Sequence, residues 1–281
     1  FLSSTPPFQN AMAMDANRCG IPVVYGFCRG VGSVSYAAAV LLLGFVLERH
    51  APTLLLPVFA ALTACGLLAM SGFRLPERPD EAADRPAERR SIAAVLRSHP
   101  RFALTLLGCM FFFLTHTISN TYMNALVGKA GGTASAVGTS LAISAVLELP
   151  AMTLVSRLQK RFSPGFFLRF AAGAEVVKFL IFYLARSMPL IYLGHCMQFF
   201  QFAVYAPATV YYVAAALPER DQLKGQSLIY VAGSGLGGAL GNLLGGRLLD
   251  RSGIQAALLL GTVSAAASLL TFCLSTRENS R

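Results

Sequence analysis

The chain has 281 residues, of which 55% are hydrophobic and 13% are charged, and its formal net charge is +10. Taken alone, that net charge would fit a nucleic-acid-binding protein. Long apolar runs fill most of the chain, however, and they leave no room for a separate water-soluble domain.

Eight apolar runs follow one another between residues 30 and 274. A helix of about 20 residues rises about 1.5 Å per residue and so matches a hydrocarbon core about 30 Å thick. The runs lack the alternation of a membrane β-barrel, and a helical bundle is the other structure that can cross a bilayer. The sequence therefore predicts an all-α, polytopic membrane helical bundle with about eight complete spans, at residues 30–47, 54–73, 102–126, 136–155, 166–185, 190–217, 227–246 and 254–274.

The first twenty residues resemble the end of a further, incomplete span. The chain begins at Phe1 without a Met, and no basic segment precedes an apolar core, so we expect an N-terminally truncated fragment rather than a signal peptide. A polar stretch at 74–101, rich in Pro, Arg and acidic residues, separates two spans from six and is interpreted as a linker between bundles. Within it, residues 91–99 fit a short interfacial helix and a mobile charged loop equally well.

The links between the spans are alternately rich and poor in basic residues. One set of links holds seventeen Lys and Arg residues and the opposite set holds five, which is the pattern of the positive-inside rule. This pattern predicts a multi-pass protein of the cell inner (plasma) membrane, surrounded by the lipid bilayer, with its linker and C-terminus in the cytoplasm. The charges flank the spans, so we reject nucleic acid as a partner. We also expect the protein to be a monomer.

Several signatures of other classes are missing from the sequence. Six cysteines are scattered without a CxxC pair, so neither a zinc site nor a disulfide framework is predicted. The HExxH and GxSxG patterns of hydrolases and the GxxxxGK[ST] loop of ATP-driven pumps do not occur. We therefore expect a protein that is not an enzyme and that needs no cofactor or bound metal.

Three ionisable residues, Glu148, Glu175 and Lys178, lie inside predicted spans. Charge at the bilayer centre is costly, so such residues generally face a partner or a transport path. Glu175 and Lys178 are three residues apart on one helix and could neutralise each other as a structural ion pair. Glu148 has no basic neighbour on its own helix, which makes it the preferred proton site.

Uncharged polar side chains also occur within the spans. His116 begins a polar half-helix that includes Asn120; it fits a proton or substrate site and a hydrogen-bonded packing residue equally well. Gln198, Gln201 and Tyr205 supply amides and a phenol along one long helix, groups that hydrogen-bond hydroxyl-rich ligands. We therefore name His116 as a candidate for proton coupling and the other four as candidate substrate contacts.

Glycines at 233, 237, 241 and 245 form a GxxxG ladder. Such a ladder lets a neighbouring helix approach closely in a membrane, so we expect a packing surface there, with further close contacts at residues 30–32. The substring GSGLGG fits a dinucleotide-binding pattern by its letters alone. It lies within a span and follows no strand, so this interpretation is rejected.

Several strings spread along the chain resemble the major facilitator superfamily, in particular its lactose-permease-like branch of proton-coupled sugar transporters. The strings are YGFCRGVGSVSYA, LELPAM, QFFQFAVYAPATVYYV, DQLKGQ and GGRLLDRSG. The resemblance implies two six-helix bundles joined by a cytoplasmic linker. Residues 1–73 would then be the C-terminal part of the first bundle, 74–101 the linker and 102–281 the second bundle.

The same resemblance bears on the candidate residues. Lys178 matches the position of an essential Arg in the permease, and Glu148 lies about one turn from its acidic residue in the eighth span. Where the permease has a His and, three residues later, a proton-carrying Glu, this chain has Gln198 and Gln201. Neither amide can carry a proton, so the resemblance implies that coupling uses Glu148, Glu175 or an acid outside this chain.

The resemblance implies a secondary active transporter, a proton-coupled symporter of a sugar or similar small polar solute, working by alternating access between two rocking bundles. Its partners would be a small-molecule substrate and protons. The alternative within the superfamily is an exporter or importer of drugs, nucleosides or aromatic acids. A receptor built on a transporter fold is a further alternative, marked by saturable binding without flux.

Overall fold

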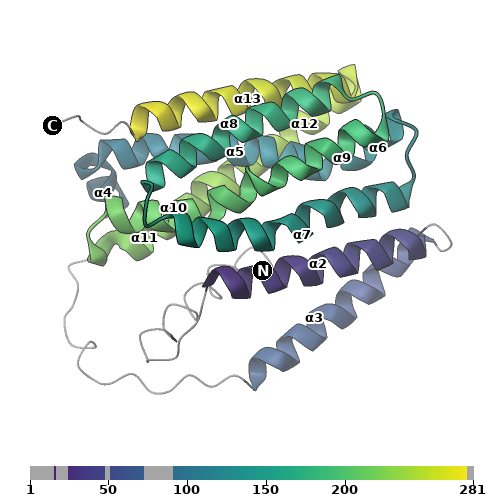
Figure 1. Cartoon of the computed structure of the whole chain (residues 1–281), viewed down its shortest axis with the longest axis horizontal. Helices are drawn as coiled ribbons and strands as arrows, with labels where there is room; N and C mark the ends of the chain where they lie inside the picture. Colours follow the sequence, from purple (N-terminus) through teal and green to yellow (C-terminus); the bar gives the residue numbers. More distant parts are fainter. Residues whose placement is uncertain (1–15, 17–24, 48–50, 73–90, 277–281) are drawn as a thin grey trace.

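The computed structural model describes residues 16, 25–47, 51–72 and 91–276, and within them all regular structure is helical (Figure 1). The helices of the first part are α2 (Tyr25–Leu47) and α3 (Leu55–Ser71), the latter preceded by a 3₁₀ turn, Pro52–Leu54. The longer second part contains α4 (Ile92–Ser98), α5 (Pro100–Thr121), α6 (Met123–Lys129), α7 (Ala134–Leu158), α8 (Pro164–Leu184), α9 (Met188–Cys196), α10 (Phe202–Ala216), α11 (Glu219–Tyr230), α12 (Gly238–Ser252) and α13 (Ile254–Ser275).

These helices confirm the all-α membrane bundle. Five continuous helical stretches in the described residues are long and apolar enough to cross a membrane: α5, α7, α9–α10, α11–α12 and α13. Helix α8 has 21 residues, about 31 Å at 1.5 Å per residue, and it carries two buried ionisable residues, Glu175 and Lys178. Helices α2 and α3 supply the two shorter apolar stretches.

Successive spans of the second part run in opposite directions and pack into one bundle, with α2 lying along α7 (Figure 1). The core of the bundle is aromatic and aliphatic, with Phe112, Phe179 and Phe272 fully buried. Between α2 and α7 the packing depends on small residues: Gly44 lies against Gly138, and Ala37 packs with Ala142 and Ala145. We call this contact the α2–α7 seam.

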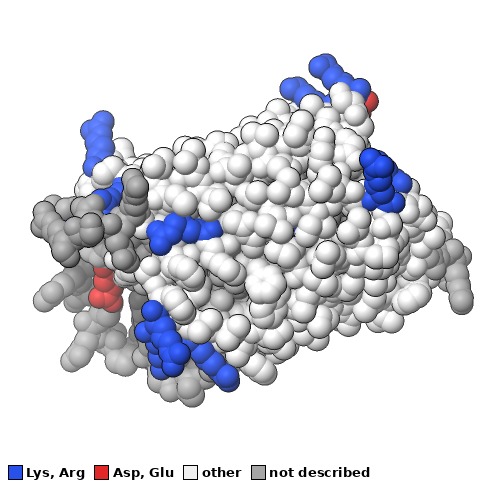
Figure 2. Space-filling view, turned by 45° about the horizontal axis from the view of Figure 1, so that its top comes forward, with Lys and Arg blue, Asp and Glu red and all other residues white. Residues whose placement is uncertain are grey.

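On the face that Figure 2 shows, charged side chains gather toward the two ends of the bundle and leave a largely uncharged surface between them. The helix bounds place two sets of described Lys and Arg residues in the links or within the first or last two turns of the spans. One end has Arg97, Arg101, Arg157, Lys160, Arg161, Arg169, Arg220 and Lys224, and the other has Lys129, Arg186, Arg247 and Arg251. The uncharged surface is what the hydrocarbon of a bilayer requires; which end faces the cytoplasm stays a prediction.

Residues 91–99 form a short helix rather than a loop. Ser91 caps α4, its Oγ accepting a hydrogen bond from the Ala94 N–H at 3.2 Å. Val95 is fully buried in the same hydrophobic cluster as Phe102 on α5. Helix α4 ends before Pro100, which starts α5 at the position where proline is favoured. Residues 73–90 of the linker lie outside the described part.

The glycine ladder packs against α5, as predicted. A Cβ at Gly241 would lie 2.6 Å from the Leu114 carbonyl oxygen, and one at Gly233 would lie 2.7 Å from the Phe113 ring. Part of the ladder belongs to a π-helical segment, Val231–Gly237, that joins α11 to α12. The expected close contact at residues 30–32 is wrong at Gly32, which has no neighbouring atom within 4 Å of an added Cβ; on α2 the close approach is made by Gly44.

Candidate functional site

Four polar side chains from four helical segments form a hydrogen-bonded chain inside the bundle. The Lys178 ammonium on α8 donates to Oε1 of Gln198 at 3.0 Å. Nε2 of Gln198 donates to Oε1 of Glu148 on α7, also at 3.0 Å. Oγ of Ser33 on α2 donates to the other oxygen of Glu148 at 2.5 Å. We call Ser33, Glu148, Gln198 and Lys178 the polar chain.

A break in the α9–α10 span positions Gln198. Residues Met197–Phe199 form a 3₁₀ turn between the two helices. The N–H groups of Phe200 and Gln201 both bond the Met197 carbonyl, each at 3.0 Å. Short 3₁₀ stretches within long helices often mark functional positions. Here the break places the Gln198 amide between α7 and α8, where it can serve both charged neighbours.

Burial explains why the polar chain must be satisfied. Lys178 is 1% exposed and Gln198 is 4% exposed, while Glu148 is partly exposed. An unpaired charge in such a place costs several kcal/mol. The opposite charges of Lys178 and Glu148, joined through one amide, largely offset that cost. Lys178 also lies 5.8 Å from the centre of the Phe182 ring, within the range of a cation–π contact.

Ser33 links the first part of the chain to the second. It lies on α2 next to the α2–α7 seam, and its hydroxyl reaches a carboxylate 115 positions later in the sequence. Ser33 is not among the residues predicted from the sequence. The available signal was its small polar side chain in an apolar span, within the string YGFCRGVGSVSYA, but the string gives no hint of the contact with α7.

Glu175 and Lys178 lie on one buried face of α8, but they do not form the ion pair considered from the sequence. Glu175 is fully buried, and neither carboxyl oxygen has a hydrogen-bond partner. Lys178, one turn away, donates to Gln198 instead. The structure thus brings together Glu148, Gln198 and Lys178 and leaves Glu175 outside the polar chain.

His116 and Asn120 form a separate pair on α5. Asn120 Nδ2 lies 3.0 Å from Nε2 of His116 and 3.0 Å from the His116 carbonyl oxygen. The imidazole stacks on Phe202 of α10, with the ring centres 4.4 Å apart, while its Nδ1 is buried without a partner. This arrangement is compatible with both roles considered for His116.

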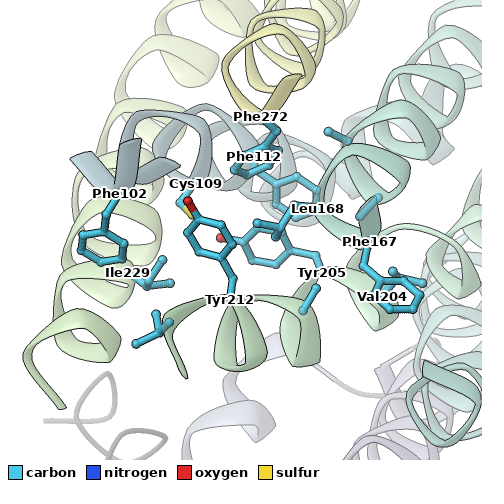
Figure 3. Packing of buried hydrophobic residues seen from close by; sticks show 14 of the residues in the cluster. Phe102, Cys109, Phe112, Phe167, Leu168, Val204, Tyr205, Tyr212, Ile229 and Phe272 are labelled. Atoms are coloured by element: carbon cyan, nitrogen blue, oxygen red, sulfur yellow. The ribbon is translucent and has the colours of Figure 1, made fainter. Parts of the chain in front are cut away.

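Gln201 and Tyr205 are buried within the bundle. Both amide atoms of Gln201 lack a hydrogen-bond partner. Tyr205 stacks on Phe112 with ring centres 3.9 Å apart, and Figure 3 shows its ring among Leu168, Phe272 and Tyr212. Tyr205 therefore packs as a core residue in this conformation, although it stays a proposed substrate contact.

A second buried imidazole, His195 on α9, is tied to α7. Its Nδ1 lies 2.6 Å from Oγ of Ser144, and its Nε2 lies 3.4 Å from the Met123 sulfur. Ser144 is one turn before Glu148 on the same helix, so this contact fixes α7 against α9 beside the polar chain. In the described part of the chain, no group of three or more His, Cys, Asp or Glu side chains could hold a metal ion.

One family model covers most of the chain. The model of the MFS_1 like family matches residues 14–260. Maltose permease of Geobacillus stearothermophilus is 29% identical over 252 residues, which cover 89% of this chain and 62% of the permease. YwbF, an uncharacterized transporter of Bacillus subtilis, is 23% identical over 258 residues, covering 92% of this chain and 64% of that protein.

Solved structures show the same fold. Two crystal structures of FucP, the fucose:proton symporter of E. coli, match with TM-scores of 0.55 and 0.57. Their identities are 18% and 19%, and each match covers 83% of this chain and 60% of FucP. The chain thus spans less than two thirds of the length of each of these relatives.

Proposed function

The chain belongs to the MFS_1 like family, and on that premise we propose that the protein is a secondary active transporter that carries a sugar together with protons by alternating access. Its relatives are transporters rather than enzymes. One is named a maltose permease, and the FucP structures are of a fucose:proton symporter. These names support a sugar as the substrate and a proton as the coupling ion.

The observation that carries the proposal is the polar chain. Its four residues place an ammonium, an amide, a carboxylate and a hydroxyl in the interior of a membrane bundle. A sugar hydroxyl both donates and accepts hydrogen bonds, so it can take the place of any link in such a chain. The two charges of the chain balance each other, which favours an uncharged substrate.

Alternating access gives the α2–α7 seam its role. Major-facilitator transporters rock one bundle against the other around a central site, and the seam joins helices on the two sides of the linker. Ser33 on one side and Glu148 on the other share a hydrogen bond. Substrate binding or proton exchange at Glu148 would therefore act directly on a contact that must change when the bundles move.

The proposal includes the membrane and the division of the chain. We place the protein in the inner (plasma) membrane as a monomer, with residues 74–101 and the C-terminus in the cytoplasm. The basic end of the bundle supports this orientation through the positive-inside rule. Residues 1–73 and 102–281 would belong to the two bundles that move.

A second candidate is a transporter of aromatic acids, nucleosides or drugs. The stacked rings of His116 and Phe202, flanked by Phe113 at 5.8 Å from the imidazole, favour it because they offer a surface for a flat ligand. The bonded amide and carboxylate of the polar chain favour the sugar.

The test uses the complete gene product in lightly buffered, de-energised cells. External pH is recorded while mono- and disaccharides are added in turn, with cells lacking the protein as the control. Alkalinisation on addition of one sugar supports proton symport and identifies the substrate. The sugar proposal is wrong if the protein is inserted in the membrane, no added sugar changes the external pH and no labelled sugar is taken up. Nucleosides and aromatic acids are then tested next.

A further inference from the structure

Glu175 is a fully buried ionisable residue of α8 to which the proposed function gives no partner. Its side chain is fully buried, and both of its carboxyl oxygens are shielded from solvent without a hydrogen-bond partner. An ionised carboxylate in that position would lack both water and donors, which is the most costly arrangement for a buried group. A protonated carboxyl group is neutral and avoids most of that cost.

The charges of the neighbouring residues lead to the same conclusion. Lys178 and Glu148 are joined through Gln198, so the polar chain is neutral as a unit. An ionised Glu175 would add a net negative charge in a medium of low dielectric constant. It would also attract the Lys178 ammonium, since residues three apart on a helix are neighbours. In the structure, however, that ammonium bonds Gln198.

A second unused group lies at the depth of Glu175. Helix α8 and the α9–α10 span are joined by a short link, run in opposite directions and pack together. Lys178 meets Gln198, so Glu175 and Gln201, each one turn toward the same end of the bundle, come to about the same depth. Both amide atoms of the buried Gln201 are also without partners. An amide donor without a partner is thus present on the α9–α10 span at this depth.

We propose that Glu175 carries the transported proton and that Lys178 exchanges partners with it. In the state seen here Glu175 is protonated and Lys178 bonds Gln198. When a change of conformation exposes the site, the Glu175 proton leaves to water, and the Lys178 ammonium turns from Gln198 to the new carboxylate. The released Gln198 amide and Glu148 carboxylate then lose their link to Lys178, which weakens their hold on the sugar. This assignment rests on the proposed function and makes Glu148 the substrate-binding carboxylate.

Other titratable groups surround this region, and none of them bonds Glu175 in the structure. On the helices packed against α8 and on α7 these groups include, within the spans, Cys109 and His116 of α5, Glu148 of α7, Tyr192, His195 and Cys196 of α9, Tyr205, Tyr211 and Tyr212 of α10 and Cys273 of α13, with Arg101 and Arg157 nearer the helix ends. His195 is engaged by Ser144, and Glu148 by Ser33 and Gln198. Lys178 is a basic residue one helical turn from Glu175, which makes its ammonium group the partner expected for an ionised Glu175.

The first test measures the proton directly and needs no substrate. Infrared spectra of the purified complete protein are recorded for wild type and for Glu175→Gln, Glu148→Gln and Glu219→Gln, the last being an exposed control on α11. We expect a protonated-carboxyl C=O band in the wild type that disappears only in Glu175→Gln. Glu175→Asp should retain a shifted band, which separates loss of the proton from loss of the fold. A wild-type band that persists in Glu175→Gln overturns the proposal.

The second test separates the two carboxylates by transport. In Glu175→Gln we expect exchange of labelled sugar across the membrane to continue, while uphill accumulation and sugar-dependent alkalinisation are lost. In Glu148→Gln we expect weaker sugar binding. The opposite assignment, in which Glu148→Gln exchanges normally but cannot accumulate, would make Glu148 the proton carrier and overturn this inference. If the wild type moves no sugar, the proposed function fails, and the infrared result alone decides the protonation of Glu175.

Discussion

Replacing Gln198 with Leu tests the centre of the polar chain. The side chains have similar volumes, but leucine can neither accept from Lys178 nor donate to Glu148. Two hydrogen bonds to charged groups, each 3.0 Å long in the structure, are therefore removed together. The two charged residues then lose the amide that holds them apart at a fixed distance.

The size of the effect follows from those two bonds. A hydrogen bond to a charged group contributes about 1.5–3 kcal/mol, so the pair is worth about 3–6 kcal/mol. Glu148 is partly exposed and keeps its bond from Ser33, so water can replace part of the loss there, and we take about 3 kcal/mol. If the binding arrangement must be re-formed at that cost, the Kd for sugar rises about a hundredfold.

The assay is sugar binding to the purified complete protein, with thermal unfolding in detergent measured alongside. Gln226→Leu is the matched control, because Gln226 makes one hydrogen bond to the neutral carbonyl of Val210 at 3.3 Å. Such a bond contributes about 0.5–1.5 kcal/mol, and it lies outside the polar chain. If Gln198→Leu binds sugar as well as Gln226→Leu does, the polar chain is not the binding site and the reasoning fails.

Two further substitutions address the helix contacts. Ser33→Ala removes the hydrogen bond across the α2–α7 seam and should change the transport rate by about tenfold, which corresponds to the lower end of the free energy of a hydrogen bond to a charged group. The control is Ser35→Ala, which should have little effect because the Ser35 hydroxyl bonds the Val31 carbonyl of its own helix. Equal effects of the two variants would refute the coupling role of Ser33. Gly241→Ala places a methyl group 2.6 Å from a backbone oxygen of α5 and should lower stability by about 1–3 kcal/mol. Gly173→Ala meets no atom within 4 Å and should be neutral or slightly stabilising in thermal unfolding; a similar loss in both variants would contradict the close-packing argument.

The sequence predicted the spans, because continuous apolarity over about 20 residues is the length that a bilayer demands and that a soluble fold seldom needs. It also predicted that the ladder from Gly233 to Gly245 would meet a neighbouring helix, since repeated small residues have a definite use in membranes. For residues 91–99 the sequence does not decide between a helix and a loop, because a seven-residue amphipathic pattern is short. Its outcome depended on Val95, which is buried against α5.

The contacts within the site were beyond sequence reasoning for a physical reason. A helix that is apolar all round gives no periodic signal of its rotation, so the face of α8 that meets Gln198 could not be identified. Spacing favoured the pair Glu175 and Lys178, yet the lysine is long enough to choose a partner on another helix. The break at Met197–Phe199 and the reach of Ser33 to α7 depend on tertiary packing, and no local residue pattern announces them.

The α2–α7 seam also bears on how fast the two parts of the chain could slide past each other. Glycine and alanine have no side-chain rotamers to unlock, so movement along the contact between Gly44 and Gly138 meets few steric barriers. The hydrogen bond from Ser33 is then a specific polar contact that must break along that path. One bond of about 1.5–3 kcal/mol would slow the motion by roughly ten- to a hundredfold. The carboxylate of Glu148, which accepts this bond, would thus influence the rate of this motion as well as the substrate binding proposed above.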